Sequence, residues 1–199
     1  MKPGQSWALC VQHVLIWETG GDLVTGAPHL DPKDPGGFTK WGISRRRFPK
    51  VDIAALTRPG AEELYREHYW DELRCGEMPA GVALAVFDYA VPCGPPRAAR
   101  GLQRIVGASV DGRVGAKTLD ALARAIRRTS ALEVVSRVCM QRAAYFVGLS
   151  LARARDASPE PGLQLESPHA VGWLRRLADT AARAGALARE GFPQPRSIS

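Results

Sequence analysis

The sequence lacks any long hydrophobic run. No stretch approaches the ~20 consecutive apolar residues that span a bilayer, although 45% of the 199 residues are hydrophobic. Residues 1–12 hold one lysine and no long apolar block, so they do not resemble a secretory signal. We therefore expect a protein without a transmembrane segment that is made in a cytoplasm.

Cysteine and histidine are scarce. The chain has four of each, and neither set shows the spacing of a metal site. In a cytoplasm, Cys10, Cys75, Cys93 and Cys139 are expected to be reduced and mostly buried. We assign no metal and no other cofactor.

Acidic residues are scarce towards the C-terminus. Residues 1–122 hold 15 Lys plus Arg and 14 Asp plus Glu, a net charge of +1, whereas residues 123–199 hold 12 and 6, a net charge of +6. A basic half favours an anionic partner, such as nucleic acid, phospholipid or an acidic wall polymer. The alternative is a solvated face of an Arg-rich helix. Nucleic acid has little support, because no groove-reading motif and no aromatic–basic interleaving is present.

Alternating strand patterns are nearly absent, so the fold class is mainly α. Only short pieces near residues 30–43 permit strands, as a small hairpin-like excursion. The almost wholly apolar stretch Pro79–Val91 predicts a buried central helix, and Asp88 within it is expected to satisfy a buried partner. Further helices are predicted at 9–17, from 59, from 96, from 116, at 131–153 and at 169–190, with a loop between the last two.

Glu18 is the first candidate catalytic residue. It ends an apolar helix and precedes Gly20 and Gly21, which let the chain turn away and leave the carboxyl at a cleft edge. The helix C-terminus and partial desolvation by Ile16 and Trp17 both favour a raised pKa. A protonated carboxyl is what a general acid needs. The alternative is a solvated helix end with a glycine cap.

The run "DPGGFT" adds two more candidates. Pro35 fixes one dihedral angle, and the two glycines permit tight turns. Such a bend can bring Asp34 and Thr39, five residues apart, to one side of the excursion. A Glu, an Asp and a Thr together can cleave a glycosidic bond, with the Glu as acid and the others positioning water or steadying the cationic sugar. Alternatively, Asp34 only bonds its own backbone in a turn.

The stretch "ETGG…DPKDPGGFTKWGIS" resembles the signature of glycoside hydrolase family 108, the N-acetylmuramidases often found as phage endolysins. The resemblance continues through "LYREHYWDEL", "MPAGVALAVFDYAV" and "GLQRIVGASVDGRVGAKTLDAL", and covers about residues 8–177. It implies a lysozyme-like helical fold with Glu18 as the catalytic residue and supporting roles for Asp34 and Thr39. Pro92 departs from the family, which commonly has Asn there, so a polar cleft contact is missing.

The resemblance also implies a domain organisation. Residues 8–92 form the muramidase catalytic region, and residues 93–155 a peptidoglycan-binding-like helical segment packed in the same lysozyme-like unit. Apart from the resemblance, the charge and apolar pattern predicts a basic helix over residues 168–191, expected to dock through Trp173 and to offer Arg176, Arg183 and Arg189 to an anionic outer-membrane or wall surface.

The resulting hypothesis is a monomeric, endolysin-like muramidase. It hydrolyses the β-1,4 bond between N-acetylmuramic acid and N-acetylglucosamine, and acts on peptidoglycan glycan strands in the periplasm or wall after release from the host cytoplasm. Trp41 and Tyr89 are candidate substrate-binding residues, and core packing is the alternative for Trp41. Two other functions stay open: a lytic transglycosylase, in which the muramic 6-hydroxyl attacks in place of water, and a non-catalytic peptidoglycan-binding protein.

Overall fold

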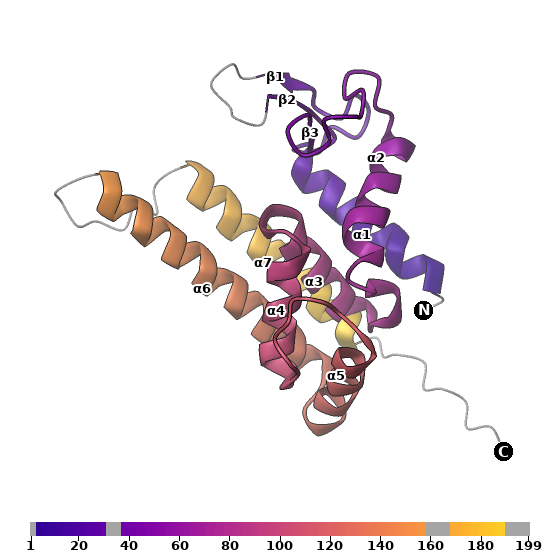
Figure 1. The fold of residues 1–199 in the computed structure, drawn as a ribbon, viewed down its shortest axis with the longest axis vertical. Helices are drawn as coiled ribbons and strands as arrows, with labels where there is room; N and C mark the ends of the chain where they lie inside the picture. Colours follow the sequence, from indigo (N-terminus) through magenta and orange to yellow (C-terminus); the bar gives the residue numbers. More distant parts are fainter. Residues whose placement is uncertain (1–2, 31–36, 158–167, 190–199) are drawn as a thin grey trace.

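The computed structural model describes residues 3–30, 37–157 and 168–189. Within them the chain is mostly helical, and a small antiparallel sheet follows the first helix in the chain (Figure 1). The elements in chain order are α1 (Pro3–Glu18), β1 (His29–Leu30), β2 (Phe38–Lys40), β3 (Ile43–Ser44), α2 (Arg58–Tyr65), the π-helical turn η1 (Arg66–Asp71), the 3-10 turn η2 (Cys75–Glu77), α3 (Ala80–Cys93), α4 (Pro95–Val106), α5 (Ala116–Arg128), α6 (Ala131–Ala157) and α7 (Pro168–Arg189). The predicted mainly α fold is confirmed.

Helix α3 is the centre of the fold. Every residue from 81 to 90 is buried, which is why its sequence is apolar on all sides. Helices α1, α4, α6 and α7 all pack against it, and α6 and α7 lie side by side as an antiparallel pair (Figure 1). Each large side chain buried here, such as Leu84 or Phe87, contributes roughly 1.5–3 kcal/mol relative to exposure.

The short strands predicted near residues 30–43 form the small sheet. Its strands run antiparallel in the order β1-β2-β3, with Thr39 opposite both His29 and Ser44. Trp41 (φ 57°) and Gly42 (φ 74°) form the two-residue turn between β2 and β3. Two positive φ angles are typical of the hairpin turn whose twist matches the strands.

Several predictions differ from the structure or lie outside it. Helix α1 begins at residue 3 and not at residue 9, and Trp7 in the added first part of the helix packs against the core. Asp34, the loop over residues 158–167 and the tail after residue 189 lie outside the described residues. No helix in the described part of the chain is long and apolar enough to cross a membrane.

Candidate active site

Glu18 stands at a sharply ended helix. The amide of Gly21 donates to the carbonyl of Ile16 at 2.8 Å, and Gly20 adopts φ 60°. These are the marks of a Schellman cap, in which a left-handed residue satisfies the last helical carbonyls. The two glycines therefore do form a cap, and the cap leaves Glu18 in the last helical turn with its side chain 20% exposed.

The β2–β3 turn lies directly against Glu18. An ideal Cβ on Gly42 would stand 2.7 Å from Oε2 of Glu18 and 2.5 Å from the hydroxyl oxygen of Tyr65. The Tyr65 hydroxyl donates to the Trp41 carbonyl at 3.0 Å. Only glycine fits at this position, and the excursion and the catalytic candidate are thereby held in contact.

Arg176 on α7 bridges two carboxylates. Its Nη1 donates to Oε1 of Glu18 at 2.5 Å, and its Nε donates to Oδ1 of Asp88 at 2.8 Å. Asp88 is fully buried, as predicted for a polar residue on the central helix, and Arg142 on α6 donates to its other oxygen. Burial opposes ionisation of Asp88, but the charges of Arg176 and Arg142 outweigh it and hold the pKa of this carboxyl well below its usual range.

A hydrogen-bonded chain extends this network to α1. The Thr180 hydroxyl lies 2.7 Å from Oδ2 of Asp88 and 3.0 Å from Nε2 of the buried His13. Burial lowers the pKa of His13, so its imidazole is neutral near neutral pH. The indole of Trp17 donates to Asp179 at 2.9 Å. Helix α7 is therefore fixed to both α1 and α3 by buried polar contacts around Glu18.

Thr39 shares a face of the sheet with Ser44, which lines a cleft, although Thr39 itself is not among the lining residues. Directly opposed residues of antiparallel strands place their side chains on the same face, and Thr39 opposes Ser44. Ser44 lines a cleft of about 390 Å³. The other residues lining this cleft are Gly42, Arg47, Phe48, Tyr69, Val91, Pro92, Cys93 and Gly94.

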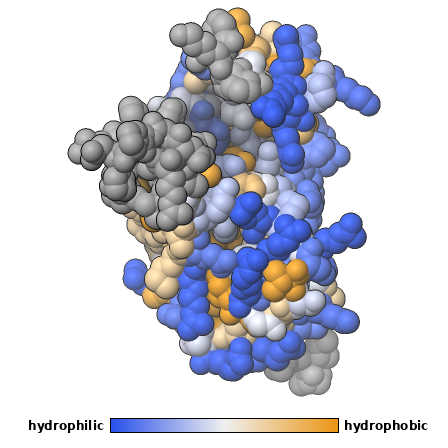
Figure 2. Space-filling view, turned by 60° about the vertical axis from the view of Figure 1, so that its left-hand side comes forward, coloured by the Kyte–Doolittle hydropathy of each residue, from blue (hydrophilic) through white to orange (hydrophobic). Residues whose placement is uncertain are grey.

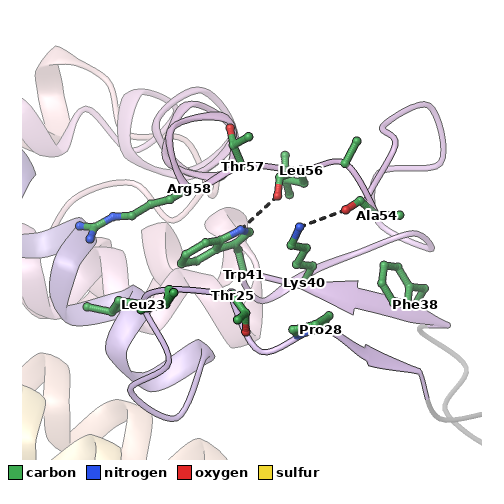
Figure 3. A pocket seen from close by; sticks show the side chains of 12 residues that line it. Leu23, Thr25, Pro28, Phe38, Lys40, Trp41, Ala54, Leu56, Thr57 and Arg58 are labelled. Carbon is green, nitrogen blue, oxygen red and sulfur yellow. Dashed lines mark hydrogen bonds between the residues drawn. The ribbon is translucent and has the colours of Figure 1, made fainter.

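Trp41 is placed differently from a sugar-stacking residue. Its ring is 3% exposed and its indole donates to the Leu56 carbonyl at 3.2 Å. It lines a second cavity, of about 480 Å³, together with Phe38 and Lys40 (Figure 3). Strand alternation puts Phe38 and Lys40 on the face opposite Thr39. The structure therefore favours core packing for Trp41.

Tyr89 also belongs to the core. It is 3% exposed, its ring lies against Gly101 on α4, and it is absent from the lining of either cavity beside the sheet. Groups of three or more metal-ligating side chains are not found among the described residues.

Arg176 lies on the buried side of the basic helix, which corrects the prediction for this residue. Arg176 was expected on its exposed side, but it is only 9% exposed and serves Glu18 and Asp88. Trp173 stacks on Phe146 at 4.9 Å between ring centroids, while Thr180 and Ala184 are fully buried. The helix thus docks through a stripe of both polar and apolar side chains. The charge pattern alone did not predict that Arg176 belongs to this buried stripe. The signal that could have pointed to it was Asp88, whose burial required a cation from elsewhere in the chain.

Comparisons with known proteins agree with this geometry. The family model described as Glycosyl hydrolase 108 matches residues 11–94, and that described as Predicted Peptidoglycan domain matches residues 97–178. A search of curated proteins found no match. Among solved structures, the chain is similar to "Structure of Brucella abortus SagA", with 32% identity over 94% of this chain and 97% of that chain, at a TM-score of 0.72. The chain belongs to glycosyl hydrolase family 108, the N-acetylmuramidases that degrade peptidoglycan.

Proposed function

We propose that Glu18 is the general acid of this muramidase. It donates a proton to the oxygen that bridges N-acetylmuramic acid and N-acetylglucosamine, and water then completes hydrolysis. The observation that carries the proposal is the position of its carboxyl, at the end of α1 and against the turn that borders the cleft. With its side chain 20% exposed, Glu18 can be reached by substrate yet is partly shielded from water.

Arg176 has a role in the same step. When Glu18 gives up its proton it becomes a carboxylate, and the guanidinium 2.5 Å away stabilises that charge. A fixed cation aimed at developing charge needs no reorganisation during the reaction.

Asp34 and Thr39 are proposed to support the reaction from the excursion. Thr39 is on the cleft face of the sheet, and Asp34 precedes it by five residues in the chain. A hydroxyl and a carboxylate there would position the attacking water or stabilise the cationic sugar.

The two family segments are proposed to act as one catalytic unit. The segment matched by the peptidoglycan-domain model contributes both Arg142 and Arg176 to the network around Glu18. A separate wall-binding module would not be expected to contribute side chains to the surroundings of the catalytic carboxyl.

The exposed side of α7 is proposed to meet an anionic envelope surface. Arg175, Arg183 and Arg189 are exposed there, and Arg183 pairs with Asp179 on the same helix. Pelleting with sacculi or anionic vesicles tests this, because replacing these three arginines with Gln should weaken binding mainly at low salt. If neither salt nor the substitutions change binding, these arginines form only a solvated helix face and do not bind the envelope surface.

We further propose an endolysin-like role for a monomer, made in the host cytoplasm and acting after release. Figure 2 shows a largely hydrophilic face with small, separate apolar patches, and the exposed large apolar side chains are scattered over several elements. Light scattering tests the monomer. Expression in a bacterial cytoplasm, with and without a membrane-permeabilising protein, tests whether lysis awaits release.

Product analysis tests the reaction itself. Sacculi digested with the protein should yield new muramic reducing ends, detected after borohydride reduction by mass spectrometry. Products ending in 1,6-anhydromuramic acid would instead identify a lytic transglycosylase. Binding to sacculi without soluble fragments would identify a non-catalytic wall-binding protein.

A further inference from the structure

The cleft beside Glu18 has walls from three parts of the chain. Gly42, Ser44 and Arg47 come from the end of the sheet, Tyr69 from η1, and residues 91–94 from the C-terminal end of α3. Gly42 joins this cleft to the catalytic candidate, because its backbone lies against the Glu18 carboxylate. A group bound in the cleft is therefore close to the scissile bond.

Arg47 provides the one formal charge among the nine residues that line the cleft. Its wall partners are neutral: Cys93 stays a thiol because burial raises its pKa to about 11, and burial also raises the pKa of Tyr69. No carboxylate among the side chains that the structure describes forms an ion pair with Arg47. The lining of the cleft thus carries one positive charge and no negative charge.

The position of Arg47 is fixed although its side chain is exposed. Its amide donates to the Ser44 carbonyl at 3.1 Å and lies 3.3 Å from the Ser44 hydroxyl. The following residue, Phe48, is 9% exposed and packs on His68 with 5.0 Å between ring centroids. The guanidinium itself stands 5.8 Å from the centre of the Tyr69 ring. Anchoring the backbone of Arg47 removes part of the entropy cost of ordering this residue when an anion binds.

The chemistry of peptidoglycan supplies an anion at this place. The glycan backbone is uncharged where muramic acid carries its peptide, because the lactyl carboxyl is then an amide. The peptide stem carries free carboxylates, and it hangs from the sugar whose C1 is cleaved. Guanidinium groups recognise carboxylates through parallel N–H donors.

We propose that the cleft lined by Arg47 and Tyr69 binds a carboxylate of the muramic peptide stem, so that the enzyme prefers glycan bearing charged peptides. This inference rests on the proposed muramidase function. Arg47 is then a specificity-determining residue.

The test compares two forms of one substrate. Sacculi are treated with an endopeptidase to remove cross-links, and half is converted to neutral amides with carbodiimide and methylamine. New reducing ends are measured for the wild type, Arg47→Gln, Arg47→Lys and the control Arg124→Gln, which alters an exposed arginine on α5. Thermal unfolding verifies that each variant is folded.

We expect the wild type and Arg124→Gln to cleave native substrate about tenfold faster than amidated substrate, as for one charge-assisted contact of roughly 1.4 kcal/mol. For Arg47→Gln the ratio of the two rates should fall to about one, and Arg47→Lys should be intermediate. The proposal is overturned if Arg47→Gln keeps the wild-type ratio of the two rates, whether or not both rates fall. It is also overturned if the wild type shows no preference for native substrate. A wild type that cleaves neither form would instead refute the muramidase function.

Discussion

The guanidinium of Arg176 lies 2.5 Å from the carboxylate of Glu18, although 158 residues separate them in the chain. The contact joins the last helix to the first at the site where chemistry is expected. Because Arg176 also holds the buried Asp88, one side chain links the catalytic candidate to the core. This relationship couples stability to activity at this position.

Replacing Arg176 should show that link. Arg176→Met leaves Asp88 and Glu18 short of a cation, and breaking a buried pair costs ~3–5 kcal/mol. Arg176→Lys keeps the charge but lacks the fork that reaches both carboxylates, so we expect a smaller loss of stability and a clear loss of activity. Denaturant unfolding and reducing-end assays measure both quantities. Arg183→Lys, at an exposed pair on the same helix, should change stability by less than ~0.5 kcal/mol.

Gly42→Ala should damage the site through sterics. The added Cβ would meet the Tyr65 hydroxyl at 2.5 Å and Glu18 at 2.7 Å, at a φ of 74°. We expect loss of activity and a stability cost above the ~1–2 kcal/mol of the left-handed conformation alone. Gly107→Ala is the matched control, because φ there is 72° and nothing lies within 4 Å. Equal effects of the two substitutions on both stability and activity would contradict the close contact.

His13 should make stability depend on pH. Its pKa is lowered in the fold, chiefly by burial, so below about pH 6.5 the unfolded chain binds a proton that the folded chain does not. Stability is therefore expected to fall as pH decreases from about 7 towards 5. His13→Gln, which can still bond Thr180, should flatten this slope in urea unfolding measured at several pH values. An unchanged slope would assign the acid sensitivity to other groups.

Much of this arrangement could be predicted from the sequence, and the reasons for the failures are physical. The apolar run around Asp88 predicted the central helix and a buried partner, and Gly20 and Gly21 predicted a turn after Glu18. Local spacing cannot identify a partner that arrives from α7, so Arg176 looked like part of a solvated basic face. Trp41 was ambiguous because a tryptophan beside a glycine suits both a sugar platform and the core.

The excursion should matter to the reaction but not to the fold. Thr39→Val removes a hydroxyl on the cleft face, and Asp34→Asn removes the proposed second carboxylate. We expect each to lower the rate of reducing-end formation while thermal unfolding stays near the wild type. Thr39→Ser, which restores the hydroxyl, should recover activity. Full activity in both Asp34→Asn and Thr39→Val would show that the bend has a structural role and takes no part in the reaction.

Glu18→Gln is the central test of the mechanism. The amide has nearly the same shape and can accept a hydrogen bond from Arg176, but it cannot protonate the bridging oxygen. A positioned general acid contributes ~10²–10⁴-fold, so we expect wall clearing to fall by about that factor. The variant should still pellet with sacculi, because the residues that line the cleft are unchanged.

The controls separate chemistry from folding. Glu63→Gln alters an exposed carboxylate on α2 and should clear walls at the wild-type rate. Circular dichroism shows whether Glu18→Gln keeps its helices, since loss of the ion pair with Arg176 removes some stability. A folded Glu18→Gln protein that degrades peptidoglycan as fast as the wild type would show that another group donates the proton. The contact between Glu18 and the Gly42 turn would then be structural, and a different carboxyl group would have to be the catalytic acid.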